Sequence, residues 1–317
     1  MYSDEISTCP GCQSSRIERA IFKSQFGFMS EADCPHDRCI ECGSVFMNPR
    51  PTIEELRRFY ESAVTEDSVL DVARSSANRV LDQDKLAYFR SNRIAPLVER
   101  LPQGARIFDV GCGVGAFIYA MSQEGYEVCG NDLSKVSVDV GRDLLGLDGS
   151  AIQVGDISEI PVGQQFDLVT LWTVIEHLLS PETFLNHLRQ NCLAQTGYIV
   201  LEFPTVDSLM FEFCHEHFFW VMPPYHINLF STQGISSLLK RAQFEVVYEH
   251  CMPNNWFFFE SYARKIGVET AELAKIKAQN PALAPAFDRL LDELSLRLGK
   301  SSTRWVLARR IDQEPRV

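Results

Sequence analysis

The chain has 317 residues, 45% of them hydrophobic, which is enough for one large α/β domain with a small appendage. Its 30 basic and 42 acidic residues give a formal charge of -12, which disfavours nucleic acid as a partner because an acidic surface repels phosphates. No stretch is apolar for long enough to span a bilayer and no basic-then-apolar leader is present, so we expect a cytoplasmic protein without a membrane partner and of undetermined oligomeric state.

Two CxxC motifs lie in the first fifty residues, Cys9-Pro-Gly-Cys12 and Cys39-Ile-Glu-Cys42. Each motif places two thiolates on one tight turn, and two facing turns complete a tetrahedral four-sulfur shell that suits zinc. Such a shell leaves no open position, so we expect a structural zinc ion, with a redox pair as the alternative. Cys34 and His36 lie between the motifs and are expected to be bystanders, since the four cysteines already complete the shell.

Residues 1–50 are predicted to form a zinc ribbon, with strands near residues 17–22 and 45–47. Zinc ribbons often bind nucleic acid or protein. This segment has five basic against seven acidic residues, so the sequence argues against a nucleic-acid interface.

Residues 51–103 are predicted to be a helical linker or lid. Thr52 and Glu55 fit a capping box for a helix from residue 53. The polar stretch 62–78 is predicted to be a loop, and a second helix is expected over residues 80–100.

From residue 104 the sequence alternates between strand and helix patterns, which predicts a Rossmann-like, doubly wound, mostly parallel sheet in a domain over 104–317. One of these helices is expected to begin after Ser180 and to end at Gly197. A ligand should bind at the carboxyl ends of the strands. We expect strands at 106–110, 127–132, 151–156, 166–173, 198–204 and 244–250.

The segment DVGCGVG (109–115) follows the first of these strands and fits the glycine pattern of dinucleotide-binding loops. Asp132 lies 21 residues after Gly111, at the end of the second strand, where it could accept hydrogen bonds from both ribose hydroxyls. A nicotinamide cofactor would fit these residues, so the loop alone leaves an NAD(P)-dependent oxidoreductase open.

Three further features favour a different ligand. Asp109 would meet a pyrophosphate unfavourably but suits an ammonium or sulfonium group. Asp156 ends the third strand, where it could accept from an adenine amino group while Ile157 packs on the ring. The segment Trp172–His177 follows the fourth strand and brings acid–base groups to the same crevice.

These residues together resemble class I S-adenosylmethionine-dependent methyltransferases over roughly residues 80–250. The resemblance is carried by DVGCGVG, Asp132 in GNDLS, GDISEIP (155–161) and FDLVTLWTVIEHLLSP (166–181). The preceding CPGC…CIECGSVFMNPRPT resembles bacterial methyltransferases with an N-terminal zinc ribbon, many of which act on small metabolites, sugars or natural-product intermediates. The resemblance implies a seven-stranded sheet with an antiparallel last strand near 304–311 and a helical insertion at about 253–300.

The resemblance also implies the cofactor's contacts. The methionine part would lie against the glycine loop, the ribose at Asp132 and the adenine at Asp156 and Ile157. The expected cofactor-binding residues are Asp109, Gly111, Cys112, Gly113, Gly115, Asp132, Leu133, Asp156, Ile157 and Trp172. The implied activity is methyl transfer to a small molecule, on oxygen before carbon or nitrogen, in secondary-metabolite or sugar biosynthesis.

Three residues are candidates for handling the acceptor's proton. His226, in the rigid segment PPYHIN, is the preferred base. Glu176 and His177 follow the fourth strand, where the alternative is a helical cap and packing against the cofactor. The remaining alternative for the whole chain is a non-catalytic zinc-ribbon adaptor or nucleic-acid-binding protein.

Overall fold

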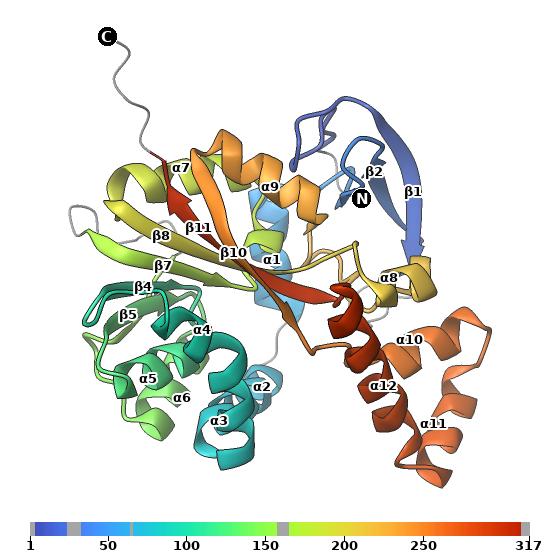
Figure 1. Ribbon diagram of the computed structural model, residues 1–317. Helices are drawn as coiled ribbons and strands as arrows, with labels where there is room; N and C mark the ends of the chain where they lie inside the picture. The colour runs from blue at the N-terminus through green and yellow to red at the C-terminus, as the bar shows by residue number, and fades with distance from the viewer. Residues whose placement is uncertain (1–3, 24–32, 64–65, 157–164, 312–317) are drawn as a thin grey trace.

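The computed structural model describes residues 4–23, 33–63, 66–156 and 165–311 (Figure 1). At its centre lies a seven-stranded sheet with the order β10-β11-β8-β7-β4-β5-β6. Only β11 runs against its neighbours, so the predicted doubly wound sheet with an antiparallel last strand is confirmed. The strands are β4 (Arg106–Val110), β5 (Glu127–Asp132), β6 (Ile152–Val154), β7 (Phe166–Trp172), β8 (Leu193–Pro204), β10 (Phe244–Met252) and β11 (Thr303–Arg310).

Helices cover both faces of this sheet. One face carries α5 (Ala116–Gln123), α6 (Lys135–Leu145) and α2 (Glu66–Leu81), and the other carries α7 (Pro181–Asn191) and α9 (Thr232–Arg241). Successive residues of a strand point to opposite faces of the sheet, so that Leu168 packs in the hydrophobic core on one face and Val169 in the core on the other. The strands are therefore apolar on both faces, as expected of parallel strands between helices.

The linker is more helical than predicted. The capping box of α1 (Ile53–Ala63) is confirmed, because the Thr52 N–H donates to Glu55 Oε2 at 2.8 Å and the Glu55 N–H donates to Thr52 Oγ1 at 3.2 Å. The predicted loop at 62–78 is wrong, since α2 occupies most of it. Most side chains of α2 are polar, so its helical pattern is weak. Its buried face consists of small residues, Ala73 and Ala77, which pack against the helices on the sheet.

The single helix expected over 80–100 is also wrong. The structure has α3 (Gln83–Phe89), a π-helical segment η1 (Arg90–Ile94) and α4 (Ala95–Val98). The Asp82 carboxylate accepts from the backbone N–H groups of Asp84 and Lys85, both at 3.1 Å, and so begins a new helix after α2 ends.

Helix α7 begins after Ser180 as predicted, but Ser180 makes no side-chain capping bond and the helix ends at Asn191 rather than Gly197. Strand β8 starts at Leu193, which pairs with Phe166 of β7, and Gly197 lies inside that strand. The central strand β8 therefore includes a segment that the sequence pattern assigned to the helix.

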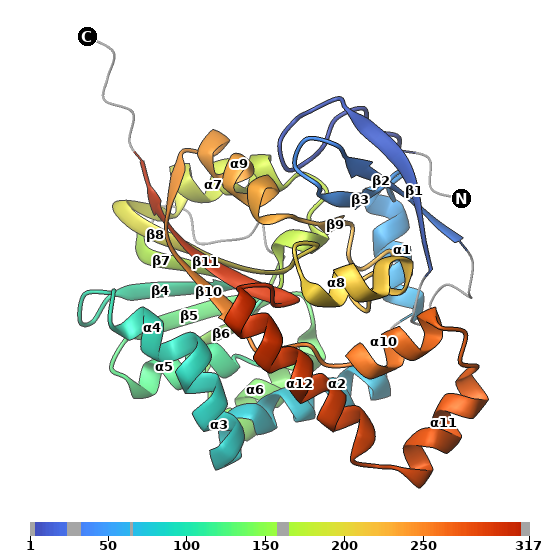
Figure 2. The same cartoon turned by 45° about the vertical axis from the view of Figure 1, so that its right-hand side comes forward.

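The N-terminal region forms a second sheet with the order β1-β2-β3-β9 (Figure 2). Its strands are β1 (Ile17–Lys23), β2 (Asp33–Cys39), β3 (Val45–Met47) and β9 (Asn228–Leu229). Strand β2 separates the two predicted strands, and β9 comes from the later domain, pairing Val45 with Leu229. This sheet thus crosses the expected boundary at residue 50.

The predicted insertion is helical. It contains α10 (Phe258–Lys265), α11 (Thr270–Gln279) and α12 (Leu283–Leu298), and it leads into β11. Helix α8 (Leu209–Cys214) packs between this insertion and the N-terminal sheet (Figure 2). Among the described helices, none is both long and apolar enough to cross a membrane.

Candidate active site and metal centres

The glycine loop connects β4 to α5. Gly111, Gly113 and Gly115 have φ values of 63°, 58° and 74°, a left-handed conformation that glycine adopts without strain. A Cβ atom at Gly111 would lie 3.0 Å from Val174 Cγ2, so the turn also packs against the segment that follows β7. The Cys112 N–H donates to the Asn131 carbonyl at 2.9 Å, which holds the loop against β5.

Asp132 lies at the carboxyl end of β5 and faces this loop. Its Oδ2 accepts from the Gly113 N–H and its Oδ1 from the Ser134 N–H, both at 2.8 Å. Burial raises the pKa of Asp132, while these two backbone donors lower it. The backbone therefore orients the carboxylate, and each of its oxygens can accept one more hydrogen bond, for example from a ligand hydroxyl.

Asp109 is 2% exposed at the end of β4. The Thr170 hydroxyl donates to Asp109 Oδ1 at 2.6 Å. Burial raises the pKa of Asp109 to about 7, with Thr170 and Arg93 opposing the rise. The carboxyl is thus poised near neutral pH, and a bound cation would favour its ionised form.

The adenine side of the expected site is only partly described. The Asp156 carbonyl accepts from Asn131 Nδ2 at 2.8 Å, which fixes the end of the third strand beside β5. Leu133 is 63% exposed and Cys112 is half-buried. Ile157 lies outside the described residues.

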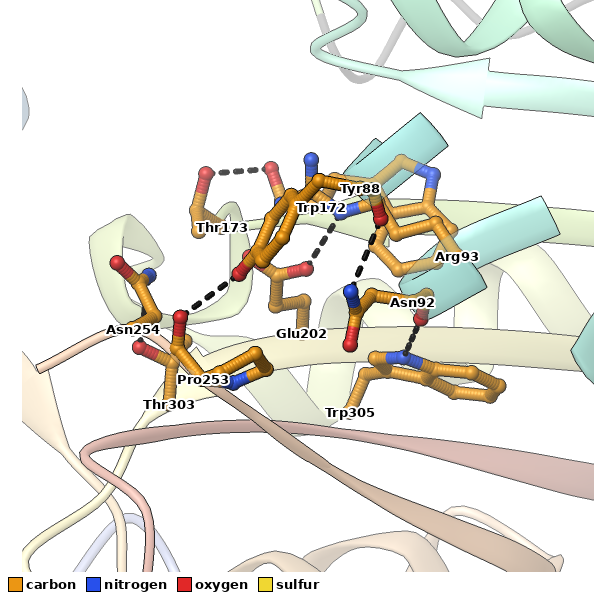
Figure 3. Close-up of polar contacts among 10 residues, drawn as sticks. All are labelled: Tyr88, Asn92, Arg93, Trp172, Thr173, Glu202, Pro253, Asn254, Thr303 and Trp305. Atoms are coloured by element: carbon orange, nitrogen blue, oxygen red, sulfur yellow. Dashed lines mark hydrogen bonds and ion pairs between the residues drawn. The ribbon is translucent and has the colours of Figure 1, made fainter. Parts of the chain in front are cut away.

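Trp172 ends β7 and joins a polar cluster that the sequence did not predict (Figure 3). Arg93 of η1 donates to both carboxylate oxygens of Glu202, at 2.8 and 2.6 Å. Its guanidinium lies 5.0 Å from the Trp172 ring, and the Trp305 indole N–H donates to the Asn92 carbonyl at 3.0 Å. These contacts fasten the linker helices over the carboxyl ends of β7 and β8.

Arg93 gives no sequence signal, because a π-helical turn has no recognisable pattern. Glu202 does give one, since it is a lone carboxylate inside the apolar strand segment YIVLEFP and is 1% exposed. Carboxylates in that position are almost always paired, so a buried cation partner could have been expected.

The three predicted acid–base residues lie together. Glu176 and His177 belong to the short helix η2 (Ile175–His177), and His226 lies in the loop before β9. One ligand atom from each residue lies within 4.8 Å of the other two. The His177 and His226 rings meet edge-on with centroids 5.0 Å apart.

The side chains of this cluster have little contact with solvent. Glu176 is fully buried and His226 is 6% exposed, while His177 is half-buried. Burial raises the pKa of Glu176 to about 8 and lowers the pKa of His226 to about 3. Burial also lowers the pKa of His177, although hydrogen bonding to the backbone carbonyls of Tyr225 and Thr173 partly raises it. An imidazole with so low a pKa is a weak proton acceptor near neutral pH, which argues against His226 acting unaided as a base.

The N-terminal sheet holds the His226 loop. The Met47 N–H donates to the Ile227 carbonyl at 2.8 Å, and the Ile227 N–H donates to the Glu176 carbonyl at 3.0 Å. A second connection runs through Arg50, which is 4% exposed. Its Nη1 donates to the Leu179 carbonyl at 2.7 Å and its Nη2 to Asn228 Oδ1 at 3.2 Å.

The two CxxC turns face each other as predicted. Cys9 and Cys42 bring their Sγ atoms to 3.7 Å, and Cys12 and Cys39 bring theirs to 3.4 Å, with no disulfide among them. Zinc–sulfur bonds of about 2.3 Å in a tetrahedron place sulfurs roughly 3.8 Å apart, so the four thiols fit a zinc ion. His36 is buried against Phe22 and is not part of this cluster, and the side chain of Cys34 lies outside the described residues.

The glycine loop, Asp132 and the segment after β7 thus lie at the carboxyl edge of the seven-stranded sheet, where ligands of doubly wound sheets bind. The sequence model of the family described as "Methyltransferase domain" matches residues 85–249, just over half of the chain. The chain therefore belongs to this family.

Curated relatives match over shorter stretches. A ubiquinone biosynthesis O-methyltransferase of Bordetella avium is 37% identical over 87 residues, which cover 26% of this chain and 35% of the relative. Its counterpart in Azoarcus sp. is 36% identical over 93 residues, covering 27% and 39%. The chain therefore matches little more than a third of the length of these relatives.

Among solved structures, one is a Haloferax volcanii complex of the Trm112 methyltransferase activator with a methyltransferase. Its match has a TM-score of 0.51 at 15% identity and covers 77% of this chain and 98% of the other. At that identity the likeness supports the fold alone.

Proposed function

We propose that the protein transfers a methyl group from S-adenosylmethionine to a hydroxyl oxygen of a small molecule. The observation that carries the proposal is the contact between Gly111 and Val174. With this contact the glycine loop lies beside the segment that bears Glu176 and His177, so a methyl donor bound along the loop would lie near these acid–base groups. The names of the curated relatives support oxygen as the acceptor atom, and the charge of -12 favours a small molecule over nucleic acid.

The cofactor would lie along the loop, with its ribose at Asp132, its adenine near Asp156 and its positive methionine end toward Asp109. The methyl carbon then moves in line from sulfur to the acceptor oxygen. The new O–C bond forms as the S–C bond breaks, and that electron pair returns to sulfur. The hydroxyl proton must also leave, and we infer that the cluster of Glu176, His177 and His226 promotes its loss.

The test is incubation of the purified chain with methyl-labelled S-adenosylmethionine and a small-molecule extract, followed by mass analysis. We expect a labelled methyl ether and a thermal stabilisation by S-adenosylmethionine that NAD does not give. Stabilisation by NAD alone, or label appearing only on nitrogen or carbon, would contradict the proposal as stated.

Asp132→Ala tests the cofactor assignment. Loss of the ribose acceptor should weaken S-adenosylmethionine about 100-fold by calorimetry, because hydrogen bonds to a charged group contribute about 1.5–3 kcal/mol each. Asp139→Ala, on the exposed side of α6, is the matched control and should bind normally. Equal affinities in the two variants would remove Asp132 from the site.

We also propose that Cys9, Cys12, Cys39 and Cys42 hold a structural zinc ion. The supporting observation is the spacing of their sulfurs, and the shell they form has no position for a substrate. Metal analysis of freshly purified protein should find about one zinc per chain at this site. Its absence from undamaged protein would contradict the assignment.

A further inference from the structure

The carboxyl group of Glu176 has no partner among the described residues. Both of its oxygens are buried, and neither accepts or donates a hydrogen bond. Native proteins seldom leave a buried carboxyl unsatisfied, and each such group indicates a missing water, proton or ion. What surrounds these two oxygens therefore indicates what they hold.

Two histidines lie near them, and each has a defined tautomer. His177 Nδ1 lies 2.6 Å from the Tyr225 carbonyl oxygen, and His226 Nδ1 lies 2.8 Å from the Trp220 carbonyl oxygen. A carbonyl only accepts, so in each neutral ring Nδ1 carries the hydrogen and Nε2 keeps the lone pair. This is also how metal-binding histidines are oriented, with one nitrogen donating to the protein and the other free for the ion.

We propose that Glu176, His177 and His226 bind a divalent first-row transition metal ion. Two imidazoles and one carboxylate form the ligand set of many zinc and non-haem iron sites, whereas magnesium and calcium prefer oxygen ligands. The three ligand atoms lie within 4.8 Å of one another, and ligands at about 2.0–2.2 Å from one ion lie roughly 3–4 Å apart. Where a pair of ligand atoms exceeds that spacing, binding of the ion would draw the two atoms together.

The site differs from the four-cysteine cluster in having only three protein ligands. An ion bound there keeps at least one position for water or a substrate oxygen. His177 is the most exposed of the three residues, so the acceptor would approach on its side. Coordination would lower the pKa of the acceptor hydroxyl, whose proton then passes to water before the oxygen attacks the methyl carbon.

This role in catalysis rests on the proposed methyl transfer, but the binding of the ion does not. Metal content and spectroscopy therefore test the site without any measurement of activity. Failure of methyl transfer with the ion in place would count against the proposed function alone.

The first test is the metal content of the full chain after reconstitution with Zn²⁺, Co²⁺, Fe²⁺ or Mn²⁺ in turn. We expect about two ions per chain with the best of these metals, one for each cluster.

The isosteric variant Glu176→Gln should hold about one ion per chain, and so should Cys42→Ser, each having lost a different ion. His187→Gln, on α7, is the matched histidine control and should hold the wild-type number. One ion in the wild type with every metal, or no loss in Glu176→Gln, overturns the proposal.

The second test uses Trp220, which stacks on His226 with ring centroids 5.8 Å apart, and its main measurement is made on the wild-type chain. Co²⁺ at His226 should quench Trp220 fluorescence, whereas Zn²⁺ should not, and Trp220→Phe should remove the quenched component. In the Co²⁺ protein, Cys42→Ser should abolish the sulfur-to-metal charge-transfer band and leave the quenching. Quenching that is absent, or that disappears with the cysteine site, overturns the proposal.

Discussion

The four-cysteine cluster and the Glu176–His177–His226 cluster are both largely buried groups of side chains that could bind a metal ion, each with its ligand atoms within 4.8 Å, but they differ in the number and chemistry of their donors. The first has four thiols and closes its own shell. The second has three donors of mixed chemistry and stays incomplete. The comparison teaches that the number of protein ligands, more than burial or compactness, separates a site that holds a fold together from one that is left open for a substrate.

The two clusters are also connected. The chain leaves the second CxxC turn as β3, and β3 pairs with β9 directly after His226. The N–H of Met47 then holds Ile227, which in turn holds the backbone of Glu176. The N-terminal sheet therefore acts as a clamp on the loop that carries the open cluster, and the predictions below probe each end of that connection.

The largest effect is expected from Cys42→Ser. Losing a thiolate should release the structural zinc, and the short strands around it have little other core, so we expect unfolding to become easier by about 4 kcal/mol. Chemical denaturation measures this change. Cys251→Ser removes a half-buried thiol outside the cluster and should cost less than about 1 kcal/mol. Equal losses in the two variants would mean that the four thiols carry no metal.

His226→Ala acts at the other cluster. We expect turnover to fall about 100-fold or more, because acceptor activation is lost whether the ring moves a proton or holds an ion. Affinity for S-adenosylmethionine should stay within about twofold, since no cofactor contact is removed. Single-turnover kinetics and calorimetry separate the two quantities. Unchanged turnover would exclude this loop from the chemistry.

These two predictions have different origins in the sequence. Cys42 can be assigned a role from sequence because its partners include Cys39 on the same turn, and local spacing survives folding. The order of the glycine loop, Asp132 and Asp156 is likewise local to successive strand ends, so the fold follows from it, and the proposed course of the cofactor rests on the same order. Even the antiparallel β11 followed from the family resemblance.

The three residues of the open cluster, Glu176, His177 and His226, could be named from the sequence, but their proximity in space could not be predicted. Glu176 and His226 are 50 residues apart, and their loops meet through a long-range hydrogen bond from the Ile227 N–H to the Glu176 carbonyl. Arg93 and Glu202 were missed for the same reason, since their ion pair spans 109 residues. The linker helices were misread because α2 owes its burial to small residues that carry a weak hydrophobic signal.

Arg50→Gln breaks the connection between the clusters without touching either. Its guanidinium bridges the loops at Leu179 and Asn228, and losing charge-assisted bonds from a buried arginine should lower the free energy of unfolding by about 2 kcal/mol. Turnover should fall roughly tenfold as the His226 loop loosens, with both metal ions retained. Arg16→Gln, an exposed arginine of the same region, should change either quantity little. If Arg50→Gln turns over normally, the clamp is structural only.

The smallest expected effect is a pH dependence of cofactor affinity that originates outside both clusters, at Asp109. Burial places the pKa of this carboxyl at about 7, so it is mostly neutral at pH 6 and mostly ionised at pH 8. A cofactor with a positive methionine end favours the ionised form, so its affinity should rise with pH, by up to about tenfold across this range. Calorimetry of S-adenosylmethionine at both pH values measures the rise.

Asp109→Asn is the control variant, because it keeps the side chain's shape and an acceptor for Thr170 but cannot ionise. Its affinity for S-adenosylmethionine should therefore be the same at pH 6 and pH 8. A wild-type affinity that falls with pH, or a slope that survives in Asp109→Asn, would place the titrating group elsewhere.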